Sequence, residues 1–252
     1  TYDKLGAHDP KYPGLALERG LLFEQTDQVD KALDMYNKAL KEAPDDLDLM
    51  LRVGSTLVMS EQPKQAIPLL NKVYSRGRRN SAEVNHFLGR AYLLDGEPSQ
   101  AISFLKTAAR TDPNNPTYHL YLGWAANDAG QTALATKAIT SALELDKQLA
   151  DAYWQRGVLL QKAGKTKEAL EDLVRALGLK PSRYQAYANM AVCYQELTEY
   201  GKAEDAWRKA IAGNAKNHEW QFRLGKILWG RNAPEDAKAH LLAAVDLSEQ
   251  YL

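Results

Sequence analysis

A period of 34 residues constrains this chain more than any other feature of its sequence. Small residues recur at one phase of the period, 34 residues apart except for one gap of 35. We call these residues the anchors: Gly20, Gly54, Gly89, Gly123, Gly157, Ala191 and Gly225. Self-similarity at a period of roughly 20 to 50 residues is the signature of a repeat protein, whose units stack on their neighbours. The sequence therefore predicts seven similar units in a row.

Three further columns of residues keep step with the anchors. The residue twelve after each anchor is alanine in all seven units, the residue sixteen after it is large and apolar, and the residue nineteen after it is alanine or valine. Glycine inside a helix costs roughly 0.5–1 kcal/mol relative to alanine, so its recurrence implies a close helix crossing without room for Cβ. The alanine is expected to face that crossing, and the large residue to fill the space between neighbouring units. Two antiparallel helices per unit follow.

Glycine and proline recur where such helices are expected to begin and end. Seven residues after the anchor, a glycine suits the left-handed end of a first helix. Nine residues after it, a proline suits the first turn of a second helix, and twenty-four after it a proline ends that helix. These three columns contain Gly96, Gly130 and Gly164; Pro63, Pro98 and Pro234; and Pro44, Pro113 and Pro181. The extra residue of the 35-residue gap is expected near Asn80 and Ser81.

Together these columns resemble the tetratricopeptide repeat family over residues 13–251. Two departures are local: the aromatic residue four before the anchor is present only as Tyr153 and Tyr187, and Arg156 replaces an apolar residue before Gly157. The resemblance implies an all-α fold, a right-handed superhelical solenoid of antiparallel helix pairs. First helices would line a concave groove and second helices a convex back. The predicted units are 13–46, 47–80, 82–115, 116–149, 150–183, 184–217 and 218–251.

The two ends of the sequence carry expectations of their own. Residues 1–12 are interpreted as the tail of a preceding repeat or an N-terminal extension, because Pro10 falls at the phase of Pro44. The seventh unit finishes at Leu247–Leu252 without the polar extra helix that solenoids generally need. We therefore expect a section of a longer protein, and end-to-end self-association of exposed terminal units is a further expectation.

Composition and motifs argue against several classes of function. Lys+Arg and Asp+Glu both number 32, so no global field favours nucleic acid, and no apolar run is long enough for membrane insertion. The five histidines are scattered, the glycines form no phosphate loop, and the lone Cys193 is expected to be a small buried residue. We predict no enzyme, no catalytic residue, no metal and no cofactor.

If first helices face a groove, its positions carry residue types that partners use as hot spots. Aromatic and arginine side chains are worth roughly 2 kcal/mol or more when a partner buries them. The predicted partner-binding residues are Phe87, Arg90, Tyr121, Trp124, Trp154, Asn189, Phe222, Arg223 and Lys226. For Trp154 and Phe222 a role in the core is an equal alternative, because residues three before the anchor also contact the neighbouring first helix.

One subset of the family holds the C-terminal carboxylate of chaperones in a five-residue clamp. Asn189 and Arg223 match that clamp. Trp154, Val158 and Glu219 stand where it requires lysine, asparagine and lysine, so chaperone-tail binding is not expected. In the family, a residue at the position of Asn189 holds a backbone amide of an extended peptide. The resemblance therefore implies this role for Asn189.

The sequence thus predicts a protein–protein interaction scaffold that binds a peptide segment or partner protein. Two alternatives stay open: an accessory, substrate-recruiting segment of a larger enzyme, and an RNA-binding helical repeat. RNA-binding arrays favour a 35-residue period and positive charge, which this chain lacks. A basic cluster at Lys72, Arg76, Arg78 and Arg79 is interpreted as a solvated turn, with docking of an acidic segment or RNA as the alternative.

Overall fold

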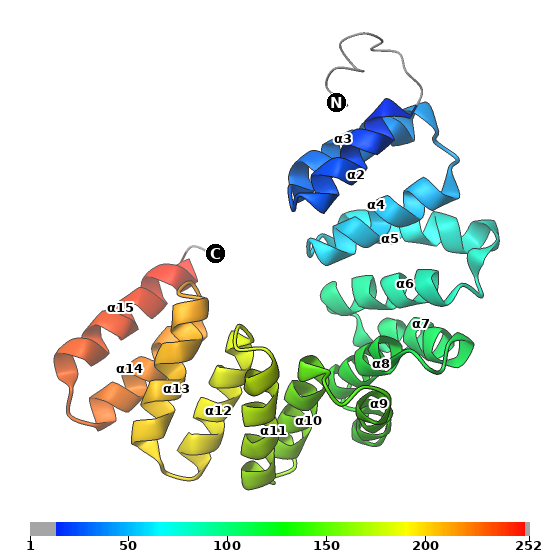
Figure 1. Cartoon of the computed structure of the whole chain (residues 1–252). Coiled ribbons are helices and arrows are strands. Elements are labelled where there is room, and N and C mark those ends of the chain that lie inside the picture. The colour runs from blue at the N-terminus through cyan, green and yellow to red at the C-terminus, as the bar shows by residue number, and fades with distance from the viewer. Residues whose placement is uncertain (1–13, 250–252) are drawn as a thin grey trace. The chain divides into compact units, whose positions relative to one another are not determined.

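The computed structural model describes residues 14–249, and these residues fold into helices without a β-strand (Figure 1). The chain divides into two compact parts, each larger than one repeat. From here on, the first unit is the part that ends at Ala135, and the second unit is the part that begins at Thr136. The all-α fold of antiparallel helix pairs is confirmed. Predictions for residues 1–12 and for the last three residues lie outside the described part.

The first unit holds three complete helix pairs and the first helix of a fourth. These helices are α2 (Leu15–Gln25), α3 (Val29–Glu42), α4 (Leu47–Met59), α5 (Pro63–Val73), α6 (Ala82–Leu94), α7 (Pro98–Thr111) and α8 (Pro116–Asp128). Each first helix packs on the second helix that follows it, and α4, α6 and α8 also contact one another in order. A shared face of neighbouring first helices results.

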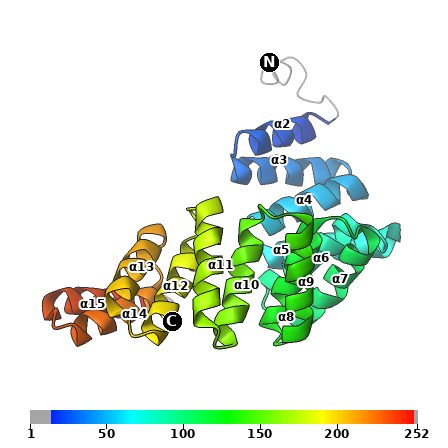
Figure 2. The ribbon, with the colours of Figure 1, turned by 60° about the horizontal axis from the view of Figure 1, so that its bottom comes forward.

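The second unit repeats the arrangement in three pairs (Figure 2). They are α10 (Ala150–Lys162) with α11 (Thr166–Leu179), α12 (Tyr184–Glu196) with α13 (Tyr200–Gly213), and α14 (His218–Gly230) with α15 (Pro234–Glu249). Helix α9 (Thr132–Leu145) begins in the first unit and continues into the second.

At five of the glycine anchors, a large side chain of the same pair lies directly over the backbone and leaves no room for a Cβ. An added Cβ would come within 2.4 Å of Leu105 at Gly89 and within 2.9 Å of Leu173 at Gly157. The alanine twelve residues after the anchor contributes its carbonyl oxygen, 3.3 Å from the same Cβ position at Gly157. The large residue thus faces the anchor of its own pair, a contact that the sequence analysis had assigned to the alanine. All seven of those alanines are fully buried.

The predicted helix ends are confirmed. Gly96, Gly130 and Gly164 have positive φ values of 80°, 71° and 74°. Four other residues adopt the left-handed conformation at the same phase, namely Asp27, Glu61, Thr198 and Asn232. Pro63, Pro98 and Pro234 are the first residues of α5, α7 and α15. The stop is therefore a property of the repeat, and glycine is one of several residues that supply it.

The backbone departs from regular helix near the extra residue of the 35-residue gap. Helix α5 continues into the segment Tyr74–Arg78, in which Arg76 (φ −88°, ψ 26°) and Gly77 (φ 114°, ψ −2°) are not helical. This kink separates α5 from α6 and lies a few residues before Asn80 and Ser81, near which the extra residue was expected.

Candidate functional site: a shared face of three first helices

Helices α4, α6 and α8 present residues of equal phase on one face. The positions six before, two before and one after the anchor are Asp48, Arg52 and Ser55 on α4; Glu83, Phe87 and Arg90 on α6; and Thr117, Tyr121 and Trp124 on α8. Residues three and four apart on a helix are surface neighbours, so each set of three lies along one side. Because the three helices contact one another in order, the sets form one continuous face.

The first feature of this face is the aromatic patch, which we define as Phe87, Arg90, Tyr121 and Trp124. The rings of Tyr121 and Trp124 are stacked, with centroids 5.8 Å apart and planes 9° apart. The Arg90 guanidinium lies 4.6 Å from the Tyr121 centroid and 5.9 Å from that of Phe87. All four residues are half-buried. The structure thus brings four of the nine predicted residues together on two adjacent helices.

A buried histidine supports the aromatic patch from below. The His86 ring is only 5% exposed, and its centroid lies 5.2 Å from Phe87, 4.9 Å from Tyr118 and 5.2 Å from Tyr121. Within the described residues its Nδ1 has no hydrogen-bond partner. Burial, with a smaller contribution from the charge of Arg90, lowers the pKa of His86 to about 3. The ring is therefore neutral at physiological pH.

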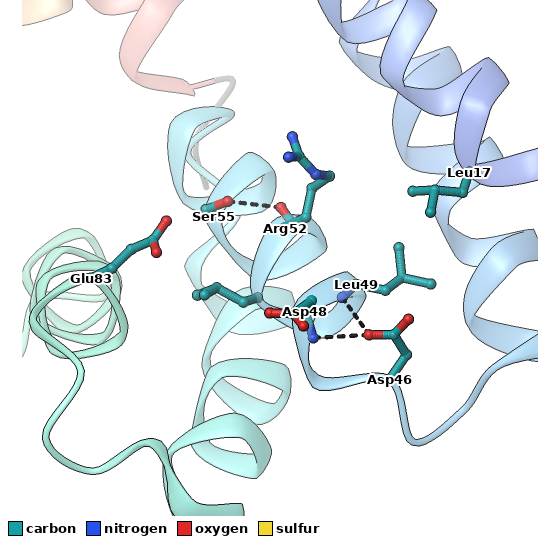
Figure 3. A pocket seen from close by; sticks show the side chains of 8 residues that line it. Leu17, Asp46, Asp48, Leu49, Arg52, Ser55 and Glu83 are labelled. Atoms are coloured by element: carbon teal, nitrogen blue, oxygen red, sulfur yellow. Dashed lines mark hydrogen bonds between the residues drawn. The ribbon is translucent and has the colours of Figure 1, made fainter.

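The second feature of the face is the acidic pocket, whose lining residues are shown in Figure 3. Its volume is about 300 Å³, and α2, α4 and α6 enclose it. Its lining consists of Leu17, Asp46, Asp48, Leu49, Leu51, Arg52, Ser55 and Glu83. Leucine side chains and the rim of carboxylates thus meet in one hollow, and Glu83 projects into it from α6.

The positive charge near this pocket is already paired. Glu24 accepts hydrogen bonds from Arg52 at 3.0 Å and from the Tyr36 hydroxyl at 2.6 Å. Arg78 lies 2.7 Å from Asp48. Asp46 caps α4, because its Oδ1 accepts the backbone N–H groups of residues 48 and 49. Glu83 makes no hydrogen bond or ion pair with any other residue in 14–249.

In the second unit, two predicted residues are used inside the protein. Trp154 is 9% exposed, and its Nε1 donates a hydrogen bond of 2.8 Å to Oδ1 of Asn189. The Arg183 guanidinium lies 4.3 Å from the Trp154 ring, and its Nε donates to Asp151 at 2.7 Å. We call these four residues the Trp154 network. Of the two alternatives for Trp154, the structure places it in the core, and the carbonyl of Asn189 is occupied.

The remaining predicted residues lie on α14. Phe222 is 48% exposed, so the core alternative does not hold for it, and Lys226 lies 5.6 Å from its ring. Arg223 pairs with Glu219 one turn away, at 2.7 Å. Trp229, on the same helix, is 66% exposed. These residues lie along one helix of the second unit.

Other side chains that could carry chemistry are structurally occupied. Lys72 and Arg76 both pair with Asp45, and this pairing lowers the pKa of that carboxyl. Cys193 is fully buried, and burial raises the pKa of its thiol to about 12. Residues 14–249 contain no cluster of potential metal ligands. In the same range, no helix has the length and apolar character needed to cross a membrane.

Sequence reasoning missed the acidic pocket. From the sequence, no partner-binding residue was predicted before Phe87. A signal was nevertheless present: Asp48 and Glu83 occupy the same phase in consecutive units, and Leu17 and Leu51 share the phase three residues later. Two carboxylates close to two leucines indicate a surface that is lined by both charged and apolar side chains.

Family models described as tetratricopeptide repeat match residues 16–46, 57–125, 150–183 and 189–251. Together with the helix pairs and the anchor contacts, they decide the assignment. The chain belongs to the tetratricopeptide repeat family.

Known tetratricopeptide proteins match it in sequence or structure. The type IV pilus assembly protein PilF of Pseudomonas aeruginosa is 32% identical over 118 residues, which is 46% of this chain and 47% of PilF. Cut9 in the APC/C complex Cut9–Hcn1 has a TM-score of 0.80 at 20% identity, covering 98% of this chain and 49% of that one. YrrB, described as having an unusual peptide-binding site, has a TM-score of 0.51 at 22% identity, covering 73% and 94%. The chain spans less than half the length of PilF and of the next two curated relatives.

Proposed function

We propose that this chain is a protein-interaction scaffold that binds an extended peptide segment on the face of α4, α6 and α8, with the aromatic patch as the main anchor. Tetratricopeptide repeats are in general non-catalytic scaffolds. The finer assignment, that this particular chain takes part in no catalysis and that this face is its binding site, is our proposal.

The proposal rests on one observation: the rings of the aromatic patch are held in place by their neighbours and are still partly exposed. Its stacked rings are held in place from one side by the buried His86 and by Arg90. Their other surfaces stay partly open to solvent, since all four patch residues are half-buried. Preorganised aromatic and arginine side chains lose little conformational entropy on binding, which is why they dominate interface energetics.

A selection from a random short-peptide library displayed on phage tests this proposal directly. The recovered peptides are synthesised with a fluorescent label, and their affinity is measured by fluorescence anisotropy. We expect the double variant Tyr121→Ala/Trp124→Ala to weaken binding by more than about 30-fold, because each ring is a hot spot. Circular dichroism checks that the helices are retained.

A matched control is Phe222→Ala, which removes an exposed ring at the other end of the chain. It should leave the affinity unchanged. Unchanged binding by the double variant would contradict the proposal, and so would a selection that enriches no peptide on the wild-type chain.

The other expectations about partners stay predictions. YrrB is described as binding a peptide, which is consistent with a peptide partner here. A role as an accessory segment of a larger enzyme, the absence of nucleic-acid binding, the boundaries of the seven units and end-to-end association all await direct tests.

A further inference from the structure

The acidic pocket differs from the rest of the proposed binding face in charge and shape. Three carboxylates, those of Asp46, Asp48 and Glu83, and one guanidinium, that of Arg52, line a hollow of about 300 Å³. The guanidinium is paired with Glu24 and the Asp48 carboxylate with Arg78, and both of these partners lie outside the lining. Negative charge therefore prevails in the pocket, although the chain as a whole is neutral.

The walls of the pocket suit a long aliphatic stem as well as a positive charge. Leu17, Leu49 and Leu51 contribute apolar surface, and the carboxylates lie around them. Lysine and arginine bury their methylene groups along apolar surface while their charged ends reach polar partners. A glutamate or aspartate of a partner would meet like charge, which is unfavourable.

The pocket and the patch are spaced so that one peptide can reach both. Glu83 and Phe87 are four residues apart on α6 and lie one above the other on the same side of the helix. The carboxylate of Glu83 is therefore the boundary between the two features, and it is the one carboxylate of the pocket without an internal partner in the described range.

We infer that the acidic pocket selects a lysine or arginine side chain of the peptide bound on this face, with Glu83 as the main charge that recognises it. The inference rests on the proposed function, since it concerns the same bound segment. The ligand class is thus a basic residue close to an apolar or aromatic one, and a purely acidic peptide is excluded.

The test uses the phage-selected peptides and the full chain. Sequencing is expected to show enrichment of lysine or arginine on the wild-type chain and loss of that enrichment on Glu83→Gln. In a recovered peptide, the basic residue is then replaced by norleucine, which keeps an aliphatic stem and removes the charge. We expect a loss of about 3- to 5-fold on the wild-type chain, typical of a partly exposed ion pair, and almost no loss on Glu83→Gln.

Asp34→Asn is the matched control, because Asp34 is an exposed carboxylate of the same unit on α3, away from the pocket lining. It should retain the preference for basic peptides, and Glu83→Lys should reverse it. Equal losses on the wild-type chain and on Glu83→Gln would overturn the inference, as would selected peptides without a basic residue.

The two proposals fail in different ways. If peptides bind through Tyr121 and Trp124 but tolerate norleucine, the binding face stands and the inference about the pocket falls. If the Tyr121→Ala/Trp124→Ala variant binds as well as the wild type, the proposed function itself falls.

Discussion

The aromatic patch of the first unit and the Trp154 network of the second contain the same kinds of residue in different states. Both combine a large ring with an arginine that lies against it. In the patch, Tyr121 and Trp124 stack on each other and stay half-buried. In the network, Trp154 is covered by Arg183, and its N–H is bonded to Asn189. The chain thus buries Trp154 in the core and leaves the patch residues partly exposed.

The difference shows that residue type at a groove position does not decide whether the side chain is buried inside the protein. A ring whose polar atom and face are already satisfied inside the protein gains little from a partner. In the network, an arginine from the turn before α12 pairs with Asp151 and lies on the indole, and the indole N–H is bonded to Asn189.

The largest expected contrast is in stability. Trp154→Ala should destabilise the second unit by about 3–5 kcal/mol, as for a large ring removed from a core. Trp124→Ala should cost less than half as much, because the ring is half-buried. Urea unfolding followed by circular dichroism measures both variants, and hydrogen exchange locates the weakened helices. Equal losses would remove the distinction between core and binding face.

An intermediate effect is expected from pH. His86 lies at the same phase as Trp154, but its Nδ1 lacks the partner that Trp154 has. Its pKa of about 3 in the folded chain is below the ordinary value of 6.5. Between these values the unfolded chain binds the proton and the folded chain does not, so stability falls as the pH drops from 6.5 towards 3.

At pH 5 the lowered pKa of His86 reduces the free energy of unfolding by about 2 kcal/mol relative to neutral pH. His86→Leu removes this effect, and leucine suits the position because Leu51 and Leu120 occupy the same phase. The measurement is the difference in unfolding free energy between the wild type and this variant across the pH range. A difference that does not change with pH would mean that the folded chain protonates His86 normally.

The smallest effect sharpens the comparison at the level of one hydrogen bond. Asn189→Ala leaves the Trp154 N–H without its acceptor and should cost about 1 kcal/mol. It should also leave peptide affinity unchanged, because the network is not part of the proposed binding face. Calorimetric unfolding and fluorescence anisotropy provide the two readouts. Loss of peptide binding in this variant would instead place Asn189 at the binding site.

Particular residues show why part of the site was predictable. Phe87, Arg90, Tyr121 and Trp124 were identified from phase alone, since the repeat assigns equal positions to equal faces. The same rule placed Asn189 in the groove and left Trp154 open between groove and core; the hydrogen bond between these two side chains and the Arg183 guanidinium over the indole decide that Trp154 is core. The acidic pocket was missed because its lining comes from three helices of successive repeats, so that no single repeat contains all of its carboxylates and leucines.

The sequence by itself determined the period, the helix pairs and the helix ends, because these follow from local rules: no room for Cβ at a crossing, left-handed stops and proline at first turns. The tertiary structure decided which face residues are already paired, where the chain kinks between α5 and α6, and where carboxylates line a hollow. These outcomes depend on distances between side chains of different helices. Packing sets these distances, and the pattern of residues along the sequence does not contain them.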